Sequence, residues 1–166
     1  MQTLKILDLL ETAVLSLRLD GVGKESISRP NVDFDVGDKS LVFEISVGES
    51  EAFPETETRV RLRRVAAIVV SGRLGEGTTR IDRVAQGLVD LFALYKPRRW
   101  KGVASTERVF QSLDLNGGGE TLKRSAALVA GVRKTAPGIY DGRVKSTVFI
   151  DLDVWEERYG GTGTMD

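Results

Sequence analysis

The hydrophobic and polar positions follow two different periods along the chain, which separate predicted helices from predicted strands. Residues 3–19, with Thr3 as N-cap, carry polar side chains in one narrow stripe. This predicts a helix that is buried on most sides, either within its own domain or against a neighbouring subunit. Residues 79–94 place apolar side chains at spacings of three and one on one face, which predicts an amphipathic helix. Leu41–Val47 and residues 144–155 alternate apolar and polar positions, as half-buried strands do.

The longest predicted strand, residues 59–70, has two halves of different character. RVRLRR alternates Arg59, Arg61 and Arg63 with apolar residues, which predicts one basic and exposed face. VAAIVV contains no polar residue, so this half is expected to be covered on both faces. The strand is therefore predicted to begin at the surface and to end in the core.

A glycine-rich segment, residues 71–78, joins this strand to the second helix. Its sequence SGRLGEGT has the spacing G-x-x-G-x-G, which matches neither the dinucleotide fingerprint nor the phosphate-binding P-loop. A turn that glycine permits is therefore the preferred interpretation. A small phosphate- or nucleotide-binding enzyme that uses the 71–79 loop is the less favoured alternative. Thr79 and Asp82 are predicted to form a capping box at the start of the helix.

An acidic segment, residues 48–58, precedes the long strand and contains no basic residue. Its carboxylates belong to Glu49, Glu51, Glu55 and Glu57. Their spacing does not match a calcium loop, and Pro54 argues against a regular ladder. The preferred interpretation is a solvated hairpin tip whose charges pair with the neighbouring arginines. The sharper alternative is an acidic loop displayed toward a channel or a partner.

A basic segment, KPRRWK at residues 96–101, follows the second predicted helix. Its charges suit the C-terminus of a helix, a protein interface or the backbone of a nucleic acid. Together with the basic face of the long strand, it supplies the candidate subunit interface. The candidate interface residues are Arg59, Arg61, Arg63, Arg98, Arg99 and Trp100.

The final third of the chain is predicted to be rich in strands. NGGG at residues 116–119 marks a turn, and a strand is predicted over residues 122–132. TAPG then turns the chain into the strand of residues 144–155, whose polar face carries Asp151 and Asp153. These two carboxylates could share a cation, but solvated strand carboxylates are preferred because no third acidic ligand is near. Residues 157–166 are predicted to form a flexible tail.

Composition restricts the classes of function. The chain has 166 residues, which predicts one domain over residues 1–166, and Lys plus Arg equals Asp plus Glu at 24 each. It contains neither Cys nor His, which excludes thiolate nucleophiles, disulfides and zinc–thiolate sites and removes the commonest general base. Charged residues interrupt the apolar N-terminus, so neither a signal peptide nor a membrane span is expected. No catalytic residue, metal or cofactor is predicted.

The predicted elements follow the order helix, two or three strands, helix and closing antiparallel pair. This order predicts an α+β fold with a single mixed or antiparallel sheet, two helices, and extended loops or hairpins. In the order and character of its pieces the chain resembles the lambda-type tail terminator proteins of long-tailed bacteriophages. The resemblance spans most of the chain and rests on TLKILDLLETAVLSL, on RVAAIVVSG leading to IDRVAQGLVDLF, and on ALVAGVRKTAPGIYDGRVKSTVFIDLDVW. Residues 103–121 are longer than a minimal member requires.

The resemblance implies a structural virion protein with no enzymatic activity. Such proteins form a ring, usually of six subunits, that caps the tail tube, ends its polymerisation and joins the head. The implied partners are further copies of the chain, the tail tube protein, a head–tail connector or neck protein, and DNA that slides past acidic walls without specific binding. The implied location is the head-proximal end of the tail, and the host cytoplasm during assembly. Another head–tail connector or tail tube ring protein is the alternative within this class.

Overall fold

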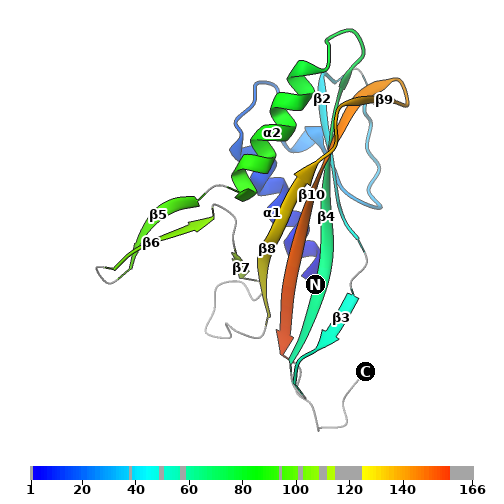
Figure 1. The fold of residues 1–166 in the computed structure, drawn as a ribbon. Helices are drawn as coiled ribbons and strands as arrows, with labels where there is room; N and C mark the ends of the chain where they lie inside the picture. The colour runs from blue at the N-terminus through cyan, green and yellow to red at the C-terminus, as the bar shows by residue number, and fades with distance from the viewer. Residues whose placement is uncertain are drawn as a thin grey trace.

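A mixed β-sheet with both α-helices on one face forms the body of the protein (Figure 1). The computed structural model describes residues 2–37, 39–48, 51–56, 59–93, 95–100, 103–108, 112–114 and 125–157. The helices are α1 (Gln2–Ser16), the short 3₁₀ helix η1 (Lys24–Ser26) and α2 (Thr79–Ala93). The strands are β1 (Ile27–Ser28), β2 (Leu41–Val47), β3 (Glu51–Pro54), β4 (Arg59–Arg73), β5 (Tyr95–Trp100), β6 (Val103–Arg108), β7 (Ser112–Asp114), β8 (Ser125–Lys134), β9 (Gly138–Tyr140) and β10 (Arg143–Glu157).

The strands of the main sheet are arranged in the order β1-β2-β4-β10-β8-β7, with β3 on β4 and β9 on β10. β1 pairs with β2 in parallel, whereas the other pairs are antiparallel. β4 and β10 form the central pair and remain in one register from Arg143 opposite Arg73 to Glu157 opposite Arg59. The predicted α+β fold, with one mixed sheet and two helices, is confirmed.

The core lies between the helices and the sheet. Alternate positions of the central strands face the helices, so the apolar half of each alternating pattern becomes the buried half. The largest fully buried side chains of this core are Phe43, Phe92, Ile6, Leu10, Ile45, Ile68, Leu88, Ile150, Leu152, Val14 and Val70. Each large apolar side chain buried in this way stabilises the fold by roughly 1.5–3 kcal/mol.

Helix α1 is covered by its own chain. The segment that follows it turns back over the helix, and its Leu17, Leu19 and Val22 pack against the core. Arg29 anchors this segment, because its Nη2 donates to Asp8 Oδ1 at 2.7 Å and its Nε donates to Glu11 Oε2 at 2.9 Å. The hydrogen bond with Asp8, followed by the interactions with Glu11, raises the pKa of the Arg29 guanidinium against the effect of burial. Of the two explanations predicted for the apolar surface of this helix, burial within its own domain agrees with the structure.

The ends of α1 differ from the prediction. The helix ends at Ser16 because Arg18 adopts a left-handed φ of 51° and its N–H donates to Leu15 O at 3.1 Å. Thr3, the predicted N-cap, is already part of the first turn of the helix. Its Oγ1 accepts a hydrogen bond from Arg64 Nη1 at 2.9 Å.

The glycine-rich segment forms a turn, as predicted, with Gly75 and Gly77 at φ values of +90° and +82°. β4 continues to Arg73, and α2 begins after Thr78, whose carbonyl accepts the N–H of Asp82 at 3.0 Å. The predicted capping box is wrong, because Thr79 is already helical and the Asp82 carboxylate instead accepts from Lys134 Nζ at 2.6 Å. A tertiary ion pair to β8 has replaced the local cap.

Gly72 lies where a side chain of α2 packs directly on β4. A Cβ at this position would lie 2.5 Å from Ile81 Cδ1, and Ile81 is only 2% exposed. We expect Gly72→Ala to lower the free energy of unfolding by about 1–3 kcal/mol, as overpacking of a filled core does. In a double-mutant cycle measured by urea unfolding, Ile81→Val should recover part of this loss because it removes the clashing methyl group. If the losses of unfolding free energy from the two single substitutions simply add in the double mutant, the contact between Gly72 and Ile81 would be contradicted.

Several strands of the structure are not predicted from the sequence. Residues 51–54 form β3 in spite of Pro54, because Pro54 ends a strand that, within the described part of the chain, has β4 as its one partner and so lies at an edge. The two-residue β1 likewise has no signal in the sequence. KPRRWK does not end the helix, since most of it lies in β5, which pairs with β6. The predicted strand over residues 122–132 is observed as Ser125–Lys134, and the NGGG turn lies outside the described residues.

Candidate functional site: the open face of the sheet

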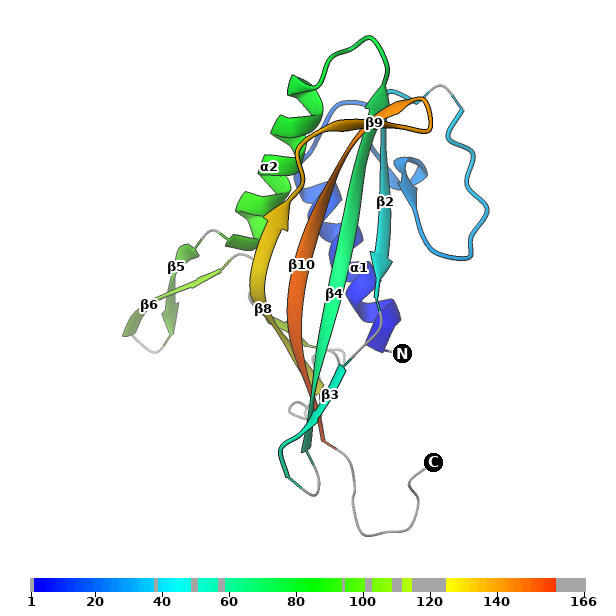
Figure 2. The ribbon, with the colours of Figure 1, turned by 45° about the vertical axis from the view of Figure 1, so that its right-hand side comes forward.

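Within the described part of the chain, no helix covers the face of the main sheet opposite α1 and α2, and β9 overhangs one end of this face (Figure 2). We call it the open face. Alternation along the strands, together with the register, assigns to it Glu44, Glu51, Phe53, Arg61, Arg63, Val65, Ala67, Val69, Arg133, Lys145, Thr147, Phe149, Asp151 and Asp153. The centre of this exposed face is apolar, which makes the face a candidate binding surface.

The centre of the open face is an apolar stripe formed by Val65, Ala67, Val69 and Phe149. All four side chains are half-buried, while Ala66, Ile68, Val148 and Ile150 on the opposite face of β4 and β10 are fully buried. The expectation that VAAIVV is covered on both faces is therefore wrong for the single chain. Helices cover one face of this segment, and the second apolar face remains accessible.

At one end of the open face, β3 and the first residues of β4 form a hairpin that extends beyond the helices, the β3–β4 arm (Figure 1). The centre of the Phe53 ring lies 5.1 Å from the guanidinium carbon of Arg61 and 5.4 Å from that of Arg63. Glu55 forms ion pairs with Arg59 at 3.5 Å and with Arg61 at 3.9 Å. The predicted charge pairing within this hairpin is confirmed.

A shallow depression of about 270 Å³ lies beside the arm and is lined by Arg63, Ala130, Asp151 and Asp153. A β-bulge produces part of it, because Gly131 and Val129 pair with adjacent residues of β10 and Ala130 is left between them. Asp151 accepts a hydrogen bond from Arg133 Nη1 at 2.6 Å. Asp153 faces Arg63 in the register.

The electrostatics of this depression do not resemble those of a metal site. Asp151 is already engaged by Arg133, whose guanidinium also lies 5.0 Å from the centre of the Phe149 ring. Within the described residues, no three Asp, Glu, His or Cys side chains gather as metal ligands. The predicted alternative of a cation shared by Asp151 and Asp153 thus has no third ligand in this part of the structure.

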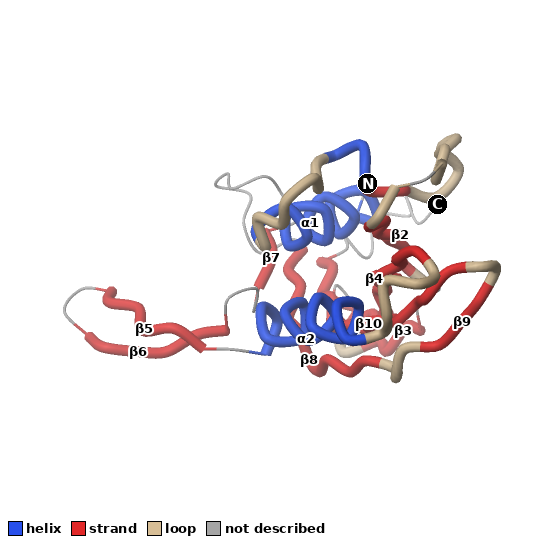
Figure 3. Tube along the Cα trace, turned by 90° about the horizontal axis from the view of Figure 1, so that it is seen from above, coloured by secondary structure: helices blue, strands red, loops and turns tan. Residues whose placement is uncertain are grey.

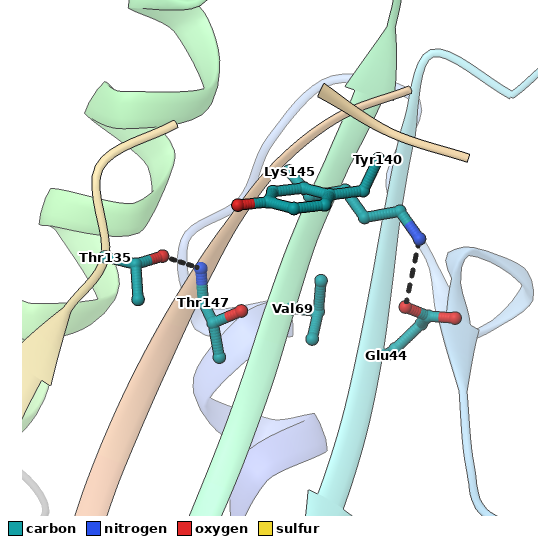
Figure 4. A pocket seen from close by; sticks show the side chains of 6 residues that line it. All are labelled: Glu44, Val69, Thr135, Tyr140, Lys145 and Thr147. Carbon is teal, nitrogen blue, oxygen red and sulfur yellow. Dashed lines mark hydrogen bonds and ion pairs between the residues drawn. The ribbon is translucent and has the colours of Figure 1, made fainter. Parts of the chain in front are cut away.

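A second depression, of about 320 Å³, lies under β9 at the other end of the open face (Figure 4). Lys145 Nζ lies 4.0 Å from Glu44 Oε2, and Thr147 N–H donates to Thr135 Oγ1 at 3.0 Å. Val69 forms the floor, and the ring of Tyr140 overhangs the site from β9. The exposed side chains of Tyr140 and Ile139 give this end of the open face an apolar rim.

Arg143 closes the sheet above this depression. Its Nε donates to Ser71 Oγ at 2.6 Å, and its Nη2 donates to Lys39 O at 2.9 Å, which leaves Ser71 only 2% exposed. Burial, followed by repulsion from Arg73, lowers the pKa of the Arg143 guanidinium. This cluster fixes the end of the β4–β10 ladder and is structural in character.

Comparison with known proteins adds little to these observations. No protein-family model matches the chain, and no curated protein matches it in sequence. One solved structure, of a protein whose name states no activity, is similar over 78% of this chain and 78% of its own at 16% sequence identity, with a TM-score of 0.46. A similarity of this size carries no argument about function. Among the described residues, no helix is both long and apolar enough to cross a membrane.

The structure separates the candidate interface residues into two groups. Arg59, Arg61 and Arg63 lie on the β3–β4 arm, beside the acidic segment that precedes them. Arg98, Arg99 and Trp100 lie on β5, in a separate two-stranded sheet that projects from the end of α2 (Figure 3). Of the four candidate glutamates, Glu51 and Glu55 are exposed on the arm, and Glu49 and Glu57 lie outside the described residues.

Sequence reasoning missed the open face as a surface, although the sequence contained a signal for it. The strand of residues 144–155 was predicted to have a polar face, and it pairs with β4 along its whole length. Two paired strands share their faces, so the second apolar face of VAAIVV had to lie beside this polar face. Arg133, Lys145 and Tyr140, which border the stripe, had no signal of their own.

The glycine-rich turn does not have the charge expected of a phosphate site. Glu76 lies within the turn, 3.8 Å from Arg73 Nη1 and 3.2 Å from Arg80 Nη1. Its carboxylate therefore neutralises the basic residues that would otherwise attract a phosphate.

Proposed function

We propose that the protein is a structural subunit of a phage tail, which assembles into a ring on the tail tube, ends its polymerisation and provides a surface for head joining. The observation that carries this proposal is the apolar stripe of the open face. Val65, Ala67, Val69 and Phe149 present apolar surface that a single chain leaves half-covered. Such surface is typical of a protein that is completed by association.

The arrangement of charge supports the same role. Exposed carboxylates, Glu51 and Glu55, occupy the β3–β4 arm, which projects beyond the body where it can meet a partner or line a channel. Acidic side chains on a channel wall repel DNA phosphates and so let DNA pass without binding. The proposed partners are further copies of the chain, a tail tube protein, a connector protein and passing DNA, and the proposed location is the virion.

Two alternatives make different predictions. Another connector ring or a tail tube protein would also assemble, and a tube protein would extend into long polymers. A nucleotide-binding enzyme would use residues 71–79, where Glu76 opposes phosphate binding and favours the structural role. Thermal stabilisation by nucleotides that disappears in Gly75→Val would support the enzyme.

The test is assembly of the purified chain. We expect size-exclusion chromatography with light scattering to give a closed oligomer of constant mass, and negative-stain electron microscopy to show rings with a central hole. The oligomer should shorten or cap tubes when it is added to a polymerising tail tube protein. A chain that remains monomeric at every concentration would contradict the proposal, and long tubes of the chain alone would favour a tube protein.

A further inference from the structure

The hairpin formed by β5 and β6 is a separate two-stranded sheet and not part of the main sheet. Among the described strands these two pair only with each other, from Tyr95 opposite Arg108 to Trp100 opposite Val103. In Figures 1 and 3 it stands away from the body of the protein. Two-stranded hairpins are marginally stable in water, so this one is expected to gain stability by packing against another surface.

The composition of the hairpin indicates the chemistry of that surface. Residues 95–108 contain five basic residues and one acidic residue, so the complementary surface should carry carboxylates. They also contain Tyr95, Pro97 and Trp100, which supply apolar area. Arginine and aromatic residues together are the composition of binding hot spots between proteins.

The open face offers both features. Glu51 and Asp153 lie on either side of Arg63 in the register, and neither forms an ion pair with any described residue. The apolar stripe begins next to them, at Val65. A basic and aromatic hairpin therefore finds unpaired carboxylates and uncovered apolar surface side by side.

The dimensions and directions also agree. Six residues of β5 span about 20 Å, and the stretch of β4 from Arg63 to Val69 has about the same length at a rise of 3.4 Å per residue. β5 starts just after α2, which covers the opposite face of the sheet. The hairpin leaves on the side away from β9 (Figure 3), so it points away from the open face of its own copy.

We propose that the β5–β6 hairpin of one copy docks across the open face of a second copy. The inference rests on the proposed ring and names the contact that would build it. The contact joins two different patches, so it is heterologous, and its repetition with a closing rotation produces a ring. Successive residues of β5 lie on opposite faces, so the docked face brings either Arg98 with Trp100 or Arg99 with Tyr95 to the second copy. The arginine supplies charge to Glu51 and Asp153, and the aromatic residue covers part of the stripe.

Charge reversal tests the contact. Arg98→Glu with Arg99→Glu should lower the ring fraction at a fixed concentration about tenfold or more, as loss of charge pairs across an interface does. The matched control is Lys24→Glu with Arg83→Glu, which makes the same change of charge at exposed positions and should retain rings. Adding Glu51→Arg and Asp153→Arg to the hairpin variant should restore the rings, because the pairs are re-formed with opposite polarity.

Crosslinking gives an independent readout in a chain that has no natural cysteine. A chain with Ser105→Cys is mixed with a chain with Ala67→Cys, the mixture is reassembled, and a short bismaleimide is added. Crosslinked dimers of the two chains are expected, whereas Thr12→Cys on α1 in place of Ala67→Cys should give none. Near-ultraviolet circular dichroism verifies that each variant is folded.

The two proposals fail in different ways. The docking contact alone would be overturned if the wild-type chain forms rings, the charge-reversed hairpin variant still forms them, and no crosslink appears between Ser105→Cys and Ala67→Cys. A wild-type chain that never assembles would overturn the docking contact and the ring together.

Discussion

Leu88→Asp is expected to abolish folding. Leu88 lies in the middle of α2 and is 0% exposed, packed between the helix and the sheet. The substitution removes apolar burial worth about 2–5 kcal/mol and places a carboxylate where it has no partner, which costs several kcal/mol more. The sum is comparable to the entire stability of an ordinary domain, about 5–15 kcal/mol.

Circular dichroism and urea unfolding measure this effect. The variant should lack a cooperative unfolding transition in conditions where the wild-type chain is folded. Arg83→Asp is the matched control, because Arg83 lies on the same helix with an exposed side chain and its substitution should leave the transition nearly unchanged. A cooperative transition in Leu88→Asp at the wild-type midpoint would mean that α2 does not contribute to the core as described.

Neutralising the acidic segment should have a large effect on assembly and a small effect on folding. The variant replaces Glu49, Glu51, Glu55 and Glu57 by Gln and changes the formal net charge from zero to +4. Glu55 takes part in surface ion pairs with Arg59 and Arg61, and such pairs contribute about 0–1 kcal/mol each. The thermal midpoint should therefore shift by only a few degrees.

The functional loss has two expected components. The ring fraction should fall because Glu51 can no longer attract the hairpin of the next copy, and double-stranded DNA should be retained at low salt because the acidic repulsion is gone. Light scattering measures the first, and gel retardation over a series of salt concentrations measures the second. Loss of folding would show that the acidic segment is structural, and unchanged assembly without DNA retention would remove it from the proposed function.

The sequence predicted the body of the fold because its strongest signals are periodic. The alternation in Leu41–Val47 and the spacing in α2 specify which face is buried, and both elements appear within one or two residues of their predicted bounds. The glycine spacing correctly predicted a turn. These features depend on local patterns, which a single chain records directly.

The errors occurred where pairing between two segments, and not the pattern within one segment, decides the structure. Asp82 binds Lys134 rather than a cap, and Pro54 ends a strand because β4 offers it a partner. The residues of β5 show no alternation of apolar and polar side chains, so only their pairing with β6 reveals a strand. The open face was missed for the same reason, since it exists only through the pairing of β4 with β10.

The unbroken ladder between β4 and β10 has a consequence for how the length of the β3–β4 arm can vary. An insertion of one residue in one strand, unless a bulge such as that at Ala130 absorbs it, would turn every later side chain to the wrong face. Matched insertions of two residues in each strand preserve both faces and lengthen the arm by about 7 Å. The length of the β3–β4 arm can therefore change in steps of two residues per strand while the rest of the domain stays the same.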